Sequence, residues 1–71
     1  MKTTIINLSD NRATILYQNK YYVATDNGVE TLIFESNPNG AVTNWIEVGG
    51  AKGVTLTEVL SDFLSYFGNI Y

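Results

Sequence analysis

Runs rich in Thr, Ile, Val, Tyr and Leu alternate with short turn signals over about the first two thirds of the chain. Asn, Asp, Gly, Ser and Pro mark the turns, and the composition of the runs between them is typical of β-strands. The predicted strands cover residues 2–8, 12–18, 21–26, 29–36 and 41–48. Because the intervening loops are short, consecutive strands pair with each other, which predicts an antiparallel β-meander.

The last third of the chain has apolar residues at every third or fourth position, which predicts an amphipathic helix at about residues 56–67. Thr55 and Glu58 have the spacing of a capping box, and Gly68 lies where a left-handed residue commonly ends a helix. The apolar stripe consists of Leu56, Val59, Leu60, Phe63, Leu64 and Phe67. The fold class predicted for residues 1–71 is therefore α+β: one small domain with about five meander strands, a glycine-rich loop at 49–54 and one C-terminal helix packed on the sheet.

Both faces of the predicted sheet are apolar. If Asn19-Lys20 and Asn27-Gly28 are two-residue hairpin loops, counting outward pairs Tyr17 with Tyr22 and fixes which side chains share a face. One face then carries Leu16, Tyr21, Val23, Leu32 and Phe34, with Trp45; the other carries Ile15, Tyr17, Tyr22, Ala24 and Ile33, with Ile46.

One helix can cover one face, so the second apolar face needs an explanation. Leu and Phe suit permanent burial better than Tyr, which assigns Leu16, Val23, Leu32 and Phe34 to the core and leaves the tyrosines outside. An exposed tyrosine-rich face favours a partner, either a foreign protein or a second copy in a homodimer. The alternative is a sheet that curls and buries both sets. The candidate partner-binding residues are Tyr17, Tyr22, Ile15, Ile33 and Trp45.

The composition of the chain disfavours several classes of function. The chain has seven carboxylates against four Lys and Arg, a net charge of −3, and no Cys or His. Scattered cations disfavour direct nucleic-acid binding, and the missing thiols and imidazoles leave no disulfide and no persuasive metal, cofactor or catalytic site. Without an apolar run of membrane-spanning length or a signal-peptide pattern, we expect a cytoplasmic, non-enzymatic protein that does not enter a membrane.

Two local segments remain candidates for recognition. The stretch EVGGAKGVT, residues 47–55, places a glycine-rich segment between a strand and a helix, but Lys52 precedes its glycine and no Gly-Lys-Ser/Thr follows. We interpret this stretch as a connecting loop, with weak anion binding near Thr55 as the alternative. Trp45 lies near Asn44 and Glu47. It either packs against its own sheet or serves as a recognition hot spot for a partner.

The segment ETLIFESNPNGAVTNWIEVGGAKGVTLTEVL resembles a group of small uncharacterised proteins encoded by bacteriophages and prophages. The resemblance covers residues 30–60 and rests on Glu30-Thr31, the Asn/Gly turn, Val42 to Trp45 and the Thr57-Glu58 helix start. It implies a setting, the cytoplasm of a bacterial host, in which accessory proteins of this size bind and inhibit host or defence proteins, the anti-CRISPR class included. It implies no site residue.

Overall fold

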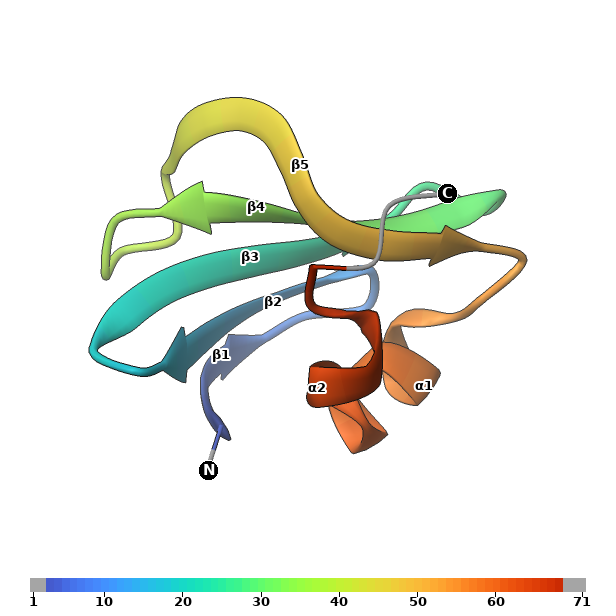
Figure 1. Cartoon of the computed structure of the whole chain (residues 1–71), viewed down its shortest axis with the longest axis horizontal. Coiled ribbons are helices and arrows are strands. Elements are labelled where there is room, and N and C mark those ends of the chain that lie inside the picture. Colours follow the sequence, from blue (N-terminus) through green and yellow to red (C-terminus); the bar gives the residue numbers. More distant parts are fainter. Residues whose placement is uncertain (1–2, 69–71) are drawn as a thin grey trace.

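A computed structural model of the chain describes residues 3–68. Five antiparallel strands follow in sheet order β1-β2-β3-β4-β5, and two short helices pack on one face (Figure 1). The elements are β1 (Thr3–Leu8), β2 (Arg12–Tyr17), β3 (Lys20–Asp26), β4 (Glu30–Ser36), β5 (Val42–Lys52), α1 (Leu56–Ser61) and α2 (Phe63–Tyr66). The predicted α+β class and the five-stranded meander are confirmed, whereas β5 extends to Lys52 and takes in much of the predicted glycine-rich loop.

The sequence predicts two-residue loops for the β2–β3 and β3–β4 hairpins. In the structure each of these turns is displaced by one residue from its predicted position. The β2–β3 turn is Gln18-Asn19, both at positive φ, because Asn tolerates that conformation better than Lys20 would. Tyr17 therefore pairs with Lys20 and Ile15 with Tyr22, so the predicted pairing of Tyr17 with Tyr22 is wrong.

The β3–β4 turn moves the other way. Asn27 accepts hydrogen bonds from the Val29 and Glu30 amides at 2.9 Å, and Gly28 takes a φ of +90°. Tyr22 consequently pairs with Glu35 rather than with Ile33. A one-residue displacement of a turn moves each cross-strand partner by two positions, so the side chains of β2, β3 and β4 keep their predicted faces.

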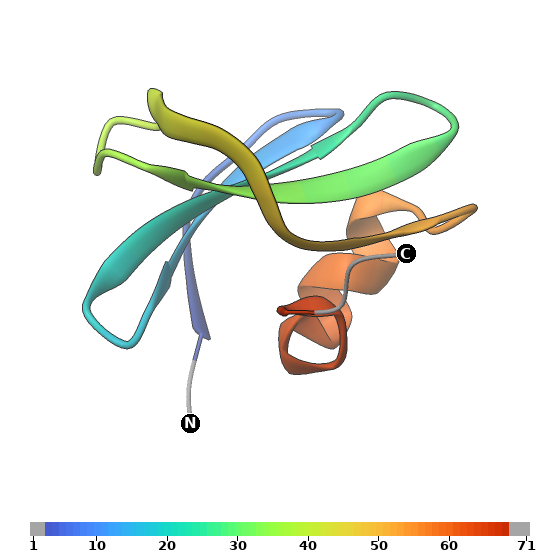
Figure 2. The ribbon, with the colours of Figure 1, turned by 45° about the horizontal axis from the view of Figure 1, so that its top comes forward.

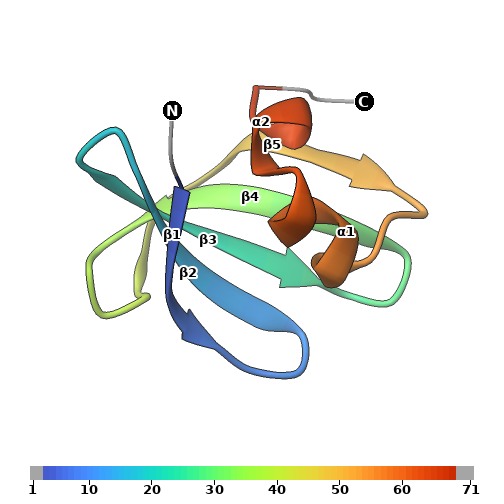
Figure 3. The ribbon, with the colours of Figure 1, turned by 90° about the horizontal axis from the view of Figure 1, so that it is seen from below.

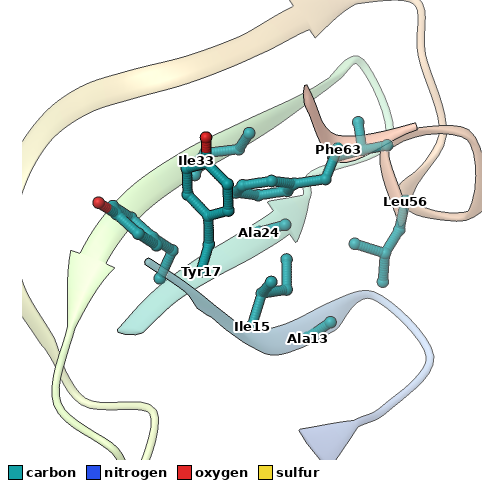
Figure 4. Close-up of a cluster of buried hydrophobic side chains, with 9 residues drawn as sticks. Ala13, Ile15, Tyr17, Ala24, Ile33, Leu56 and Phe63 are labelled. Carbon is teal, nitrogen blue, oxygen red and sulfur yellow. The ribbon is translucent and has the colours of Figure 1, made fainter. Parts of the chain in front are cut away.

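The helices cover the tyrosine face, which we call the helix face. Its core comprises Ala13, Ile15, Tyr17, Tyr22, Ala24 and Ile33 from the sheet, with Leu56, Val59 and Phe63 from the helices (Figures 3 and 4). The Phe63 ring lies 5.7 Å from that of Tyr17 and 6.2 Å from that of Tyr22, between centroids. The assignment of the tyrosines to the outside is wrong: Ala13 and Ala24 are small, and they leave room for aromatic rings from the helix.

The predicted single helix is divided at Asp62, whose backbone leaves the helical region at φ −147° and ψ 60°. Thr55 caps α1 as predicted, because its hydroxyl accepts from the Glu58 amide at 3.3 Å. After Asp62 the chain turns so that Phe63 and Phe67 reach the tyrosines, whereas Leu64, which was predicted to belong to the packed stripe, is exposed. Gly68 has the predicted positive φ.

The outer edge of β5 is covered near its middle by the segment that follows α2. Phe67 forms a β-bridge with Gly49, and the Gly68 amide donates to the Val48 carbonyl at 2.7 Å. A Cβ atom on Gly49 would lie 2.4 Å from the Tyr66 carbonyl oxygen, so glycine is what permits this approach. The C-terminal segment is thereby joined to the sheet.

The opposite face of the sheet, which carries Val23 and Phe34, is also partly covered. The β4–β5 loop folds back toward β2, where Arg12 Nη2 donates to the Gly40 carbonyl, and Thr14 is in close contact with Gly40. As a result Val23 has no exposed surface and Phe34 very little. The sheet is curled, as in the alternative considered from the sequence (Figure 2), but this face is buried only in part: Leu16, Tyr21 and Leu32 are half-buried.

Candidate functional site

Four of the five candidate partner-binding residues lie in the core. Ile15 and Ile33 are 1% and 0% exposed, and Tyr17 and Tyr22 are 9% and 5% exposed, beneath Phe63 and Phe67. These four side chains hold the helices on the sheet, and a partner cannot reach them while the helices stay there. Trp45, the fifth candidate, is 70% exposed.

The environment of Tyr22 is apolar and adjoins a carboxylate. Burial raises the pKa of its phenol above the ordinary value, and Glu35, its cross-strand partner, and Tyr17 raise it further. Tyr22 therefore remains a neutral packing residue at physiological pH rather than an acid or base of a catalytic site.

Trp45 begins a large bulge in β5. The register pairs Ile33 with Gly49 and Glu35 with Asn44, so Phe34 alone lies opposite residues 45–48. We call residues 45–48 the arch, and Figure 1 shows β5 rising away from β4 there. The bulge turns Trp45 and its neighbour Ile46 outward, and Ile46 is 72% exposed.

Two contacts order the arch. The Trp45 ring packs edge-on against Phe34, with centroids 5.1 Å apart, so one side of the indole is held by a buried ring. The Asn44 side chain accepts from the Ile46 amide at 3.1 Å and fixes the turn into the arch. The result is an exposed apolar surface on a supported backbone.

The arch contains one acidic residue. Glu47 belongs to it and is half-buried, whereas Glu35, the cross-strand partner of Tyr22, lies on the helix face, away from the contact of Trp45 with Phe34. An apolar centre with a carboxylate beside it is complementary to a basic, apolar surface on another protein.

The start of α1 has an internal carboxylate where an anion would bind. Asp26 accepts from the Leu56 amide at 3.2 Å, and the Glu58 amide is bonded to Thr55. The Thr31 hydroxyl donates to the Val54 carbonyl at 2.6 Å, which ties the strand-to-helix connection to β4. The segment after β5 therefore works as a connection, and these amides are already used within the chain.

Residues 3–68 contain no group of three or more His, Cys, Asp or Glu side chains placed to hold a metal ion. Over the same residues, no helix has the length and apolar character needed to cross a membrane.

The prediction from sequence named Trp45 but did not include Ile46 in the binding surface. Strict alternation along a regular strand puts neighbouring residues on opposite faces, so Ile46 was expected beside the tyrosines. The bulge breaks that alternation. Asn44, a residue that favours turns, inside an otherwise apolar strand was the available signal.

Comparisons with known proteins identify no relative: no family model matches the chain, and neither do the curated proteins or the solved structures that were searched.

Proposed function

We propose that the chain is a non-enzymatic protein-binding module whose contact surface is the arch, centred on Trp45 and Ile46. The observation that carries the proposal is the exposure of these two adjacent large apolar side chains on an ordered bulge. Trp is over-represented among residues that dominate binding energy, and a ring already packed on one side loses little freedom on binding.

The partner we propose is a protein with an apolar pocket for Trp45 and basic residues beside it, because Glu47 belongs to the arch and the chain has a net charge of −3. The resemblance to phage-encoded proteins supports a bacterial host or defence protein as this partner, and inhibition of it, anti-CRISPR action included, as the outcome. A homodimer through the tyrosine face would require the helices to leave the sheet, and we do not propose it.

The test is a comparison of captured proteins. Tagged wild-type chain, a Trp45→Ala/Ile46→Ser double variant and a Val29→Ser control are used to capture proteins from bacterial lysate. Val29 is 66% exposed in the β3–β4 turn, so the control removes an exposed apolar side chain, although a smaller one, away from the arch. We expect a protein that the wild type and the control retain and that the double variant loses.

The captured protein is then purified and titrated with each variant by calorimetry. Loss of the interface tryptophan should weaken binding by about 2 kcal/mol or more, roughly thirtyfold. Equal affinity of the wild type and the double variant would refute the arch as the contact surface, and so would a captured set that does not change between them.

A further inference from the structure

A pocket separate from the arch lies where the β4–β5 loop meets β1 and β2. Its volume is about 230 Å³, and its lining consists of Asn7, Ser9, Arg12, Thr14, Asn39 and Gly40. The chain has seven carboxylates and four basic residues, yet this lining contains one Arg and no carboxylate. The local charge is therefore opposite in sign to that of the chain.

The lining offers hydrogen-bond donors. Asn39 Oδ1 accepts from the Ala41 amide at 3.0 Å, so its NH₂ group is the part left to donate. Arg12 donates through Nη2 to the Gly40 carbonyl, which is uncharged, and the other guanidinium N–H groups keep their capacity to bind an anion. Ser9 donates to the Arg12 carbonyl at 3.1 Å and helps to shape the β1–β2 turn.

Thr14 contributes a hydroxyl to the lining. The residue is 5% exposed, and a Cβ on Gly40 would lie 2.9 Å from its Oγ1. None of the side-chain hydrogen bonds within residues 3–68 uses this hydroxyl, and no side-chain nitrogen or oxygen atom in that range is both buried and unpaired, so Oγ1 keeps some accessible surface. An unpaired hydroxyl that lines a pocket can donate to a ligand atom or a water molecule.

We infer that this pocket binds a small oxyanion, with Arg12 supplying the charge and Asn39 and Thr14 supplying neutral donors. Charge-assisted hydrogen bonds from a guanidinium are the strong contacts in such a site, and the fixed amide of Asn39 adds direction. A phosphate group and a carboxylate group share this chemistry. The inference does not depend on the arch or on its partner.

Asn39→Asp is the main test variant, because an Asp oxygen still accepts from the Ala41 amide while the donor is replaced by a negative charge. Asn27→Asp is the matched control, since it makes the same charge change in the β3–β4 turn and also keeps its backbone acceptor role. Thr14→Val removes the hydroxyl with little change in volume. Circular dichroism melting confirms that each variant is folded before it is titrated.

The measurement is an NMR titration with inorganic phosphate and, separately, with acetate, against sodium chloride at equal ionic strength. We expect saturable shifts at the Arg12 and Asn39 side-chain N–H signals, and binding about tenfold weaker in Asn39→Asp and in Thr14→Val but unchanged in Asn27→Asp. The anion that binds with the higher affinity identifies the class of group that the pocket prefers. Shifts no larger than those with chloride, or equal weakening by the two Asn→Asp variants, would overturn the inference.

Discussion

At the scale of single residues, Tyr17 and Tyr22 are core residues, although their residue type favoured an exposed position. Tyr17 and Tyr22 each lie about 5 Å from the Phe67 ring, at 5.1 Å and 4.9 Å between centroids, in edge-to-face geometry. Such contacts add to the burial of their rings. Their placement was missed because burial preference ranks Tyr below Leu and Phe, and that rank carries no information on the shape of the facing helix.

Replacing both tyrosines by Ser is therefore expected to unfold the domain. Truncating a buried aromatic residue costs about 3–5 kcal/mol, and the two losses together match or exceed the stability of a small domain. Circular dichroism melting checks this, with Tyr21→Ser as the control, because Tyr21 is a half-buried tyrosine on the opposite face. A double variant that melted cooperatively near the wild-type temperature would show that the helices do not rest on these rings.

Tyr22 also predicts how stability changes at alkaline pH. Burial and Glu35 raise the pKa of its phenol in the folded protein, so the neutral form is favoured there relative to the unfolded chain. The resulting stabilisation is complete below the ordinary tyrosine pKa of about 10 and is lost as the pH rises through the raised value.

The measurement is urea unfolding at neutral and alkaline pH. Tyr22→Phe should lose less stability than the wild type between the two conditions, and Glu35→Gln should show a smaller effect in the same direction. Identical pH dependence in the wild type and Tyr22→Phe would mean that Tyr22 does not titrate over this range.

At the scale of the elements, alternation along the strands predicted the two faces well, although both hairpin registers were displaced. The sequence could not predict which face the helices cover, because both are apolar and the deciding feature is the space left by Ala13 and Ala24. The bulge in β5 was missed because residues 45–48 have the composition of a regular strand, and the turn-favouring Asn44 before them was the one signal against it. The break between α1 and α2 at Asp62 was not predicted, because the apolar residues keep their helical spacing past it.

The pairing of β4 with β5 depends on Gly50. Its φ of +132° is unfavourable for any side chain, and a Cβ would lie 2.3 Å from the Thr31 carbonyl oxygen. Gly50→Ala is expected to destabilise the domain by about 1–3 kcal/mol or more, measured by urea unfolding. Gly53→Ala separates the two causes, because Gly53 has a φ of +71° but nothing within 4 Å of a Cβ. Equal losses in both variants would mean that backbone strain, and not the clash, accounts for the effect.

At the scale of the whole molecule, the sheet has two unlike edges. The middle of β5 is joined to Phe67 and Gly68, whereas β1 has a sheet partner on one side only. Ile5, Ile6 and Leu8 of β1 are 47–57% exposed, and the strand carries no charged residue. A register shift between Ile5 and Asn7 interrupts β1, and such bulges hinder pairing between edges.

We therefore expect a monomer in solution. The helices cover the tyrosine face, and the irregular β1 is a poor template for another strand. Light scattering over a wide concentration range measures the molar mass. A stable dimer would contradict the expectation, and loss of that dimer on Ile6→Lys would locate the contact at β1.

The packing of Phe63 and Phe67 over the tyrosines also has a consequence for synthesis on the ribosome. The chain emerges from its N-terminus, so β2 and β3 leave the ribosome before Phe63 and Phe67 do. During that interval the nascent hairpin presents an uncovered aromatic surface, the kind of transient exposure that makes folding intermediates prone to aggregate. The period of greatest risk for this protein thus lasts until residues 63–67 have left the ribosome and packed on the sheet.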